Sequence, residues 1–390
     1  RALAKDIGRA MEEVLQELQI PWKVGIRNGD TSTAERAKQK KQMPEILIIT
    51  PESLHFLLAQ KNYTDHFKTR QLIAIDEWHD LKGSKRGVQV ELALSHIVPI
   101  VEKAQQKQCG IWGISATIGN MEEAKEVLLS VLQKEGVIVK ANMKKQIVVE
   151  AILPDEIENY PWAGHLGIKL AHKIVPIIEE SKTTLVFINT RGMSERWYQE
   201  LLNHAPQLAG AIALHHGSIE QELRLWVEES LHTAKLKAVV CTASLDLGVD
   251  FRPVETVIQV GSPKGVSRFL QRAGRSGHSP DAVSKIYFLP THSLELVEAA
   301  ALKQAIDENL IESKQPMLLC FDVLIQYLNT LAVSDGFIPD EIWKEVKNTY
   351  CFREMNEEEW KEVLQFITAG GKALQQYDDY KKIEIIDGIF

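Results

Sequence analysis

The chain has 390 residues, of which 45% are hydrophobic and 25% charged, and it carries a formal net charge of −8. These values are those of an ordinary soluble globular protein with two or three domains. The negative charge argues against nonspecific binding of polyanions by a bulk basic field. A nucleic-acid partner would therefore have to be held by local geometry.

The charge is unevenly distributed along the chain. Residues 1–150 carry 22 basic and 19 acidic side chains, whereas residues 301–390 carry 9 basic and 17 acidic ones. The four cysteines include no C-x-x-C pair, so neither a zinc site nor a disulfide framework is indicated, and we expect a cytoplasmic location. No apolar run is long enough to span a membrane.

The first 150 residues alternate between helical and strand patterns, which predicts a parallel α/β domain. An amphipathic helix is expected over 5–18, and the capping box Ser32-x-x-Glu35 opens a second helix. Strands are expected at 46–49, 72–75 and 111–114. A basic turn at 82–87 leads into a helix at 88–101. A further helix begins at the capping box Asn120-x-x-Glu123 and runs to Leu132.

A short apolar strand at 72–75 runs directly into Asp76, Glu77, Trp78 and His79. Ligands of open α/β sheets bind beyond the carboxyl ends of the strands, which is where these two carboxylates are expected. One carboxylate can hold a hydrated Mg²⁺ while its neighbour polarises a water, as nucleotide hydrolysis requires. The alternative is a strand that ends in a solvated acidic turn.

Residues 151–312 repeat the α/β pattern in a second domain. Strands are expected at 184–188, 211–214, 238–241 and 256–260. They end in hydroxyl, amide and small residues, among them Asn189, Thr190 and Thr242, which can bond phosphates without steric conflict, and the cationic Arg191 follows Thr190. Two such sheets predict a site for a nucleotide and a groove for a polymer.

The sequence pattern changes in residues 313–390, where helical patterns replace the alternation of strands and helices. Helices are expected at 318–331 and 339–347, and Asn356-x-x-Glu359 caps a third helix that ends at 370–371. A strand at 382–386 and a tight turn at Asp387-Gly388 complete a winged-helix pattern, which we expect to be cut off in its wing. Because the region is acidic, a structural brace is as good an interpretation as a DNA-reading domain.

Two arginine- and carboxylate-containing motifs follow strands of the second domain. Gln271–His278 places Arg272 and Arg275 beside glycines, where guanidinium groups can stabilise charge on a transferring phosphoryl group. Upstream, Gly248 allows a close backbone approach and Asp250 suits a ribose hydroxyl. Each motif also has a structural alternative, since arginines near glycines often only form a salt bridge within a loop.

Taken together and in this order, these motifs resemble those of superfamily-two helicases, and within them the Lhr (large helicase-related) family. Residues 1–6 resemble motif Ia, 50–53 motif Ib, 76–79 the DExH box, 115–117 motif III, 187–191 motif IV, 242–250 motif V and 271–278 motif VI. The stretch 82–89 and the His278 ending point to Lhr; most relatives carry an arginine at that last position. The resemblance implies two RecA-like parallel α/β domains followed by a winged-helix domain.

The resemblance also implies roles in binding and hydrolysing ATP. Asp76 would hold Mg²⁺ and Glu77, also near the metal, would be the base that orients the attacking water. Gln271 would lie near that water, with Arg275 as the main arginine and Arg272 supporting it. Gly248 and Asp250 would contact the nucleotide, and His79, Ser115 and Thr117 would couple the nucleotide site to the polymer groove.

The implied partner is single-stranded DNA, with RNA or an RNA–DNA hybrid as alternatives, and DNA-repair proteins as further partners. The implied activity is ATP-driven translocation and unwinding in DNA repair. The expected contacts go to the phosphate backbone and therefore do not separate DNA from RNA. They would come from eight residues: Arg1, Thr50, Lys85, Arg86, Asn189, Thr190, Arg191 and Thr242.

One expected motif is absent. The 390 residues contain no G-x-x-x-x-G-K-[ST] phosphate loop, and the first residue is Arg1 instead of Met. We interpret this as truncation of the first domain, and we expect the 390 residues alone to hydrolyse ATP no faster than background. The alternatives are an inert relative that binds nucleic acid without chemistry, and an RNA-remodelling DExH enzyme.

Overall fold

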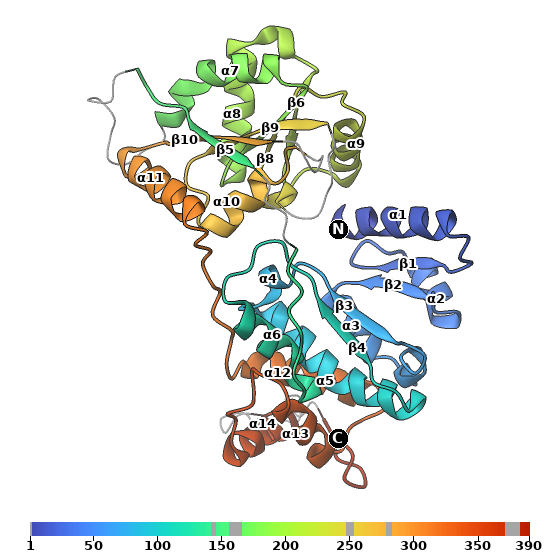
Figure 1. The fold of residues 1–390 in the computed structure, drawn as a ribbon. Coiled ribbons are helices and arrows are strands. Elements are labelled where there is room, and N and C mark those ends of the chain that lie inside the picture. Colours follow the sequence, from blue (N-terminus) through green and yellow to red (C-terminus); the bar gives the residue numbers. More distant parts are fainter. Residues whose placement is uncertain (1, 142–145, 156–165, 247–252, 278–282, 371–382) are drawn as a thin grey trace. The chain divides into compact units, whose positions relative to one another are not determined.

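The computed structural model describes residues 2–141, 146–155, 166–246, 253–277, 283–370 and 383–390. The chain forms two compact units (Figure 1). The first joins residues 3–140 to residues 313–390, and the second contains residues 141–312. None of the helices in these described ranges is long and apolar enough to cross a membrane.

The first unit contains two pairs of parallel strands. β1 (Val24–Arg27) pairs with β2 (Ile46–Ile49), and β3 (Leu72–Ile75) pairs with β4 (Gly110–Gly113). The helices of this part of the chain are α1 (Ala2–Glu17), α2 (Thr33–Lys41), α3 (Pro51–Leu58), α4 (Trp78–Leu81), α5 (Lys85–Gln105) and α6 (Met121–Leu129), with short 3₁₀ turns at Tyr63–His66 and Ser130–Leu132.

The expected elements of the first unit are present, but the helices α3 and α4 were not predicted, and two further differences concern β1 and the start of α5. The short strand β1 was not predicted, because four residues that include a glycine give almost no periodic signal. The basic stretch expected as a turn at 82–87 is partly helical. The Ser84 hydroxyl accepts the Gly87 N–H at 3.3 Å, so α5 begins at Lys85.

The second unit is built on a six-stranded, fully parallel sheet in the order β5-β10-β9-β6-β8-β7 (Figure 1). One hydrophobic core lies under α7 and α8, and another lies under α9, α10 and α11, so helices cover both faces. The strands are β5 (Ile147–Ala151), β6 (Thr183–Phe187), β7 (Ile212–His215), β8 (Ala238–Cys241), β9 (Val254–Val260) and β10 (Ser284–Leu289). The helices are α7 (Ala171–Glu180), α8 (Arg191–His204), α9 (Gln221–His232), α10 (Val266–Ala273) and α11 (Ser293–Asp307), with 3₁₀ turns at Leu166–Leu170, Pro206–Leu208 and Ala243–Leu245.

Two strands of this sheet, β5 and β10, were not predicted, although both are rich in β-branched or aromatic residues. They pair with each other from Ser284 opposite Ile147 to Phe288 opposite Ala151. The boundary expected at residue 150 therefore lies inside a strand of the second unit, and the two units meet in sequence at 140–141.

Residues 313–390 contribute α12 (Phe321–Val333), α13 (Pro339–Lys347) and α14 (Glu357–Ala369). The capping box predicted at Asn356 and Glu359 is present with both of its hydrogen bonds. Asp387 and Gly388 both have positive φ, 51° and 80°, as a tight two-residue turn requires. The strand expected at 382–386 is not formed in its described part; only an isolated antiparallel bridge joins Ile386 to Ile389.

The third region does not stand apart from the first domain. Its helices share one hydrophobic core with α3 and α5, in which Leu57 and Leu92 lie with Leu324, Leu328 and Phe352, all 0% exposed. This shared core joins the two sequence-distant regions into the first unit, and α5 is its central element.

Candidate functional site

Asp76 and Glu77 lie at the carboxyl end of β3, as predicted, and both are partly buried. Asp76 Oδ1 accepts the Glu77 N–H at 2.9 Å. Glu77 adopts a left-handed conformation (φ 52°, ψ 41°), which is unfavourable for a residue with a side chain. Non-glycine residues held in this way are concentrated at functional sites, so the backbone supports a specialised role for this turn.

The histidine of the same motif contacts the next strand end. His79 Nδ1 and Ser115 Oγ are joined by a hydrogen bond of 2.8 Å, and Glu77 Oε2 lies 3.5 Å from the same nitrogen. The Trp78 N–H donates to the Ile114 carbonyl, which holds the two strand ends together. Burial lowers the pKa of His79 below its ordinary value, so the imidazole is neutral at neutral pH.

The structure therefore brings together His79 and Ser115, the residues expected to couple a nucleotide site to a polymer groove. Thr117 lies two residues further along the same partly buried segment. Sequence spacing alone did not predict a contact between the motifs of His79 and Ser115. The contact arises because β3 and β4 pair side by side in parallel.

In the second unit, four neighbouring strand ends are joined by side chains. The Asn189 amide donates to the Ser262 carbonyl at 2.7 Å, and Arg191 donates to the Ser218 hydroxyl. His215 Nδ1 and Ser244 Oγ are hydrogen bonded at 2.8 Å. The predicted Thr242 directly follows β8, and its N–H donates to the carbonyl of His215. The polar strand ends thus form one continuous edge of the sheet.

Two of the predicted nucleic-acid contacts are helix caps. The Thr50 hydroxyl accepts the Ser53 N–H at the start of α3, and the Thr190 hydroxyl accepts the Met193 N–H at the start of α8, each at 3.4 Å. A helix N-terminus carries a partial positive charge and unsatisfied N–H groups, so it is suited to binding a phosphate. Arg191 begins α8 and is exposed beside its cap.

Lys85 and Arg86, also predicted to contact nucleic acid, already have carboxylate partners. Lys85 is paired with Asp322 at the start of α12, and Arg86 Nε lies 2.7 Å from Glu52 Oε1. All four side chains are about half exposed, so these pairs are weak and exchangeable. In this structure they tie α5 to its neighbours.

Arg272 is the clearest correction to the sequence-based expectation. It is 1% exposed, and its guanidinium donates to both oxygens of Asp246 at 2.7 and 3.0 Å and to Gln259 Oε1 at 2.6 Å. It also lies 4.6 Å over the ring of Phe187. A buried, fully engaged guanidinium does not reach a phosphate, so the structural alternative holds for Arg272. Gln271 and Arg275 are only partly buried.

Three predicted residues, Arg1, Gly248 and Asp250, lie outside the described residues, as does His278. Within the described ranges, no group of three or more histidine, cysteine or acidic side chains could hold a metal. The pair of carboxylates at Asp76 and Glu77 nevertheless fits Mg²⁺, which takes one or two carboxylates and completes its shell with water and phosphate.

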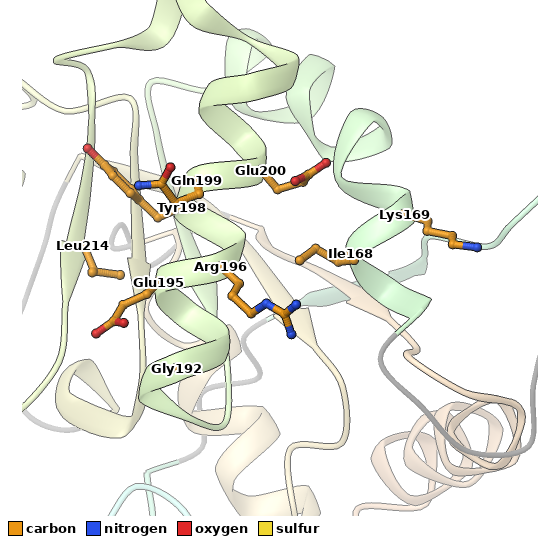
Figure 2. Close-up of a pocket in the computed structure, with 9 residues that line it drawn as sticks. All are labelled: Ile168, Lys169, Gly192, Glu195, Arg196, Tyr198, Gln199, Glu200 and Leu214. Atoms are coloured by element: carbon orange, nitrogen blue, oxygen red, sulfur yellow. The ribbon is translucent and has the colours of Figure 1, made fainter.

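An open hollow of about 700 Å³ lies along one side of α8 (Figure 2). Its lining contains none of the residues predicted from sequence, but it includes Gly192, which follows Arg191 in the chain. Its lining mixes cationic, acidic and apolar side chains and favours no one ligand: Ile168, Lys169, Gly192, Glu195, Arg196, Tyr198, Gln199, Glu200 and Leu214.

The fold and these motifs define a superfamily-two helicase core. Residues 1–126 match the DEAD/DEAH box helicase family, 168–279 the helicase conserved C-terminal domain, and 304–389 the winged helix domain of large helicase-related proteins. With these three domains in this order, and with the relatives described next, the chain belongs to the Lhr family. The predicted fold class, two RecA-like domains with a C-terminal winged helix, is confirmed.

Several relatives match almost the whole chain. It is 34% identical to ATP-dependent helicase Lhr-Core protein 2 of Thermococcus barophilus and 31% identical to ATP-dependent helicase Lhr-Core of Methanothermobacter thermautotrophicus, in both cases over 98% of this chain. The structure of Mycobacterium smegmatis helicase Lhr bound to ssDNA and AMP-PNP superimposes with a TM-score of 0.82 at 28% identity and covers 94% of this chain. The chain spans only 45%, 46% and 49% of these proteins.

Proposed function

We propose that this chain is the core of an ATP-dependent helicase that moves along single-stranded DNA and unwinds DNA or RNA–DNA duplexes in DNA repair. The observation that carries the proposal is the hydrogen bond between His79 and Ser115. It links the carboxylates suited to nucleotide chemistry to a neighbouring strand end, as a protein that converts hydrolysis into movement requires.

At the nucleotide side, we propose that Asp76 holds Mg²⁺ through water and that Glu77 accepts a proton from the attacking water. Mg²⁺, when bound, supplies charge neutralisation on the phosphates of ATP. The left-handed backbone of Glu77 fixes the direction in which its carboxylate leaves the strand. Gln271 is assigned to positioning that water, Arg275 to stabilising transition-state charge, and Gly248 and Asp250 to the nucleotide.

At the polymer side, we propose that phosphates are held by Thr50, Asn189, Thr190, Arg191 and Thr242. The support is that Thr50 and Thr190 cap helices, so that backbone N–H groups and helix dipoles are added to the side-chain contacts. These groups read the backbone and not the bases. The solved Mycobacterium smegmatis relative is bound to ssDNA, which favours DNA as the polymer of this chain.

The proposal is tested with Glu77→Gln in the full-length protein. The amide keeps the size of the side chain but cannot take a proton, so turnover of ATP should fall by about 10²–10⁴-fold. Single-strand binding should remain at the wild-type level, because the polymer contacts lie elsewhere. The matched control is Glu362→Gln on the exposed surface of α14, which should change neither property.

Turnover is measured with single-stranded DNA and, in parallel, with RNA. Normal turnover in Glu77→Gln would remove this residue as the base. Stimulation by RNA alone would favour an RNA-remodelling enzyme. A wild-type protein that binds single strands tightly without any turnover would show that the chain belongs to an inert binding protein.

A further inference from the structure

The point at which the chain leaves the second unit and enters the first is held on both sides. Glu312 is the last residue of the second unit, and Ser313 is the first residue of the returning segment. We call residues 312–315 the connector. Each of its ends makes contacts inside its own unit, and each set of contacts involves an element that carries a site motif.

Glu312 holds the start of α10, the helix that carries Gln271 and leads into Arg275. Its carboxylate accepts the Ser267 N–H at 3.0 and 3.1 Å. The cap position of this helix is Gly265, which has no side chain to provide a cap, so Glu312 takes over that function. A Cβ on Gly265 would lie 2.3 Å from Glu312 Oε1, so a side chain there would displace this carboxylate from its present position.

The other end of the connector is fixed to the turn that follows the DExH box. Lys314 Nζ donates to Asp80 Oδ1 at 3.0 Å, and Asp80 belongs to α4, the short helix that also carries His79. Lys82 Nζ donates to Ser313 Oγ at 3.3 Å.

Two features make this end rigid. Lys82 is 2% exposed and is also paired with Glu123, so it holds Ser313 from a fixed, buried position. Gly83 has φ +76°, and a Cβ there would lie 2.5 Å from the Gln315 carbonyl oxygen. The connector backbone therefore passes so close to the turn that no side chain fits between them.

A single peptide bond separates the residue that caps α10 from the residue held by Lys82. Neighbouring Cα atoms are about 3.8 Å apart, so only a short piece of backbone joins the two attachments. A flexible interdomain linker would need many more residues and no fixed contacts. Each attachment holds the connector to an element of its own unit that carries a site motif, so a change at one attachment can reach the other through a short piece of backbone.

We propose that Glu312 is a positioning residue and that the connector transmits the state of the arginine-bearing α10 to the DExH turn, coupling ATP turnover to movement on nucleic acid. This inference rests on the proposed helicase function. The attachments differ in character. The hydrogen bond to α10 and the Lys314–Asp80 pair are polar and exchangeable, whereas the contact at Gly83 is steric, so the two ends can be perturbed separately.

The test compares duplex unwinding with ATP turnover in the full-length protein. In Glu312→Ala and Gly83→Ala, we expect the number of base pairs unwound per ATP to fall by about tenfold, a typical size for coupling between sites. The KM for ATP and the affinity for single-stranded DNA should stay unchanged. Glu312→Gln, whose amide oxygen can still accept the Ser267 N–H, should restore most of the coupling.

Gly210→Ala is the matched control for Gly83→Ala. Gly210 also has a positive φ, +81°, but nothing lies within 4 Å of an added Cβ. It therefore reproduces the backbone strain without the clash, and its coupling should remain that of the wild type. Equal losses in the two glycine variants, or parallel losses of turnover and unwinding, would overturn the inference.

A second measurement requires no ATP. Hydrogen exchange of the peptide that contains the Ser267 amide should accelerate in Glu312→Ala of the 390-residue chain. Unchanged exchange would show that Glu312 does not hold α10 and would overturn the inference, even if the protein is a helicase. Absence of DNA-stimulated turnover in the wild type would instead refute the proposed function, and with it the coupling role.

Discussion

At the scale of the single residue, two neighbouring arginines of one motif differ in burial and in contacts. Arg272 points into the core and holds Asp246 and Gln259, whereas Arg275, beyond Gly274, is only partly buried. Arg272 completes the charge balance of a carboxylate that is itself 5% exposed. The role of Arg272 is thus to hold Asp246 against Gln259 of β9.

Replacing Arg272 with methionine should therefore be a stability defect. Removing one partner of a buried pair leaves an uncompensated charge and typically costs about 3–5 kcal/mol. We expect this loss in urea unfolding of the 390-residue chain. Arg268→Ala is the control: Arg268 lies 3.5 Å from the same carboxylate but is 41% exposed, so its loss should cost at most about 1 kcal/mol. Similar losses in both variants would contradict this assignment.

At the scale of the element, α5 unites the first domain with the winged helix. Its buried face carries Glu91, whose carboxyl oxygen accepts the Cys351 N–H at 2.9 Å. Burial raises the pKa of Glu91 to about 8, from an ordinary value of 4.5, although the backbone N–H groups oppose the shift. The contact between the two regions is therefore made by a carboxyl group that is protonated at neutral pH.

This shift predicts how stability depends on pH. Below pH 4.5, Glu91 is protonated in both folded and unfolded chains. Between pH 4.5 and 8 only the folded chain keeps the proton, so the free energy of unfolding falls as pH rises.

The glutamine variant Glu91→Gln cannot ionise and should be more stable than the wild type at pH 8, by about 3–5 kcal/mol at about 1.4 kcal/mol per pKa unit. At pH 4.5 the two proteins should unfold together. Thermal unfolding across this range measures the difference, with Glu362→Gln as the exposed control. A constant offset at every pH would show that Glu91 does not titrate as described.

At the scale of the whole molecule, a net charge of −8 has to be reconciled with the proposed polyanionic ligand. The capped helix starts at Thr50 and Thr190 offer local positive potential without a basic surface. Binding should accordingly depend on few ionic contacts and show little sequence preference.

Single-strand affinity should therefore fall as salt rises, and Arg191→Ala should reduce the slope of the log–log plot by about one. The loss should be equal for unrelated sequences. Arg196→Ala removes another exposed arginine from the same helix, at the hollow shown in Figure 2, and should leave the slope unchanged. Fluorescence anisotropy at several salt concentrations measures both; indifference to salt or a strong sequence preference would argue against a translocase groove.

The sequence by itself determined the elements with strong local signals. The short apolar strand before Asp76, the capping box at Asn356 and the two-residue turn at Asp387 are each specified by residues close together in the chain. Their conformations follow from side-chain hydrogen bonds and steric limits within a few residues, so short patterns suffice.

Only the tertiary structure decided which charged side chains pair with one another. Arg272 is structural because strand pairing places Gln259 and Asp246 beside it, and Lys85 finds Asp322 from more than 200 positions away. Glu312, an isolated acid in a loop, carried no sequence signal at all. Its importance arises because glycine at position 265 leaves room for it, and such complementarity between distant segments is fixed by packing and not by local pattern.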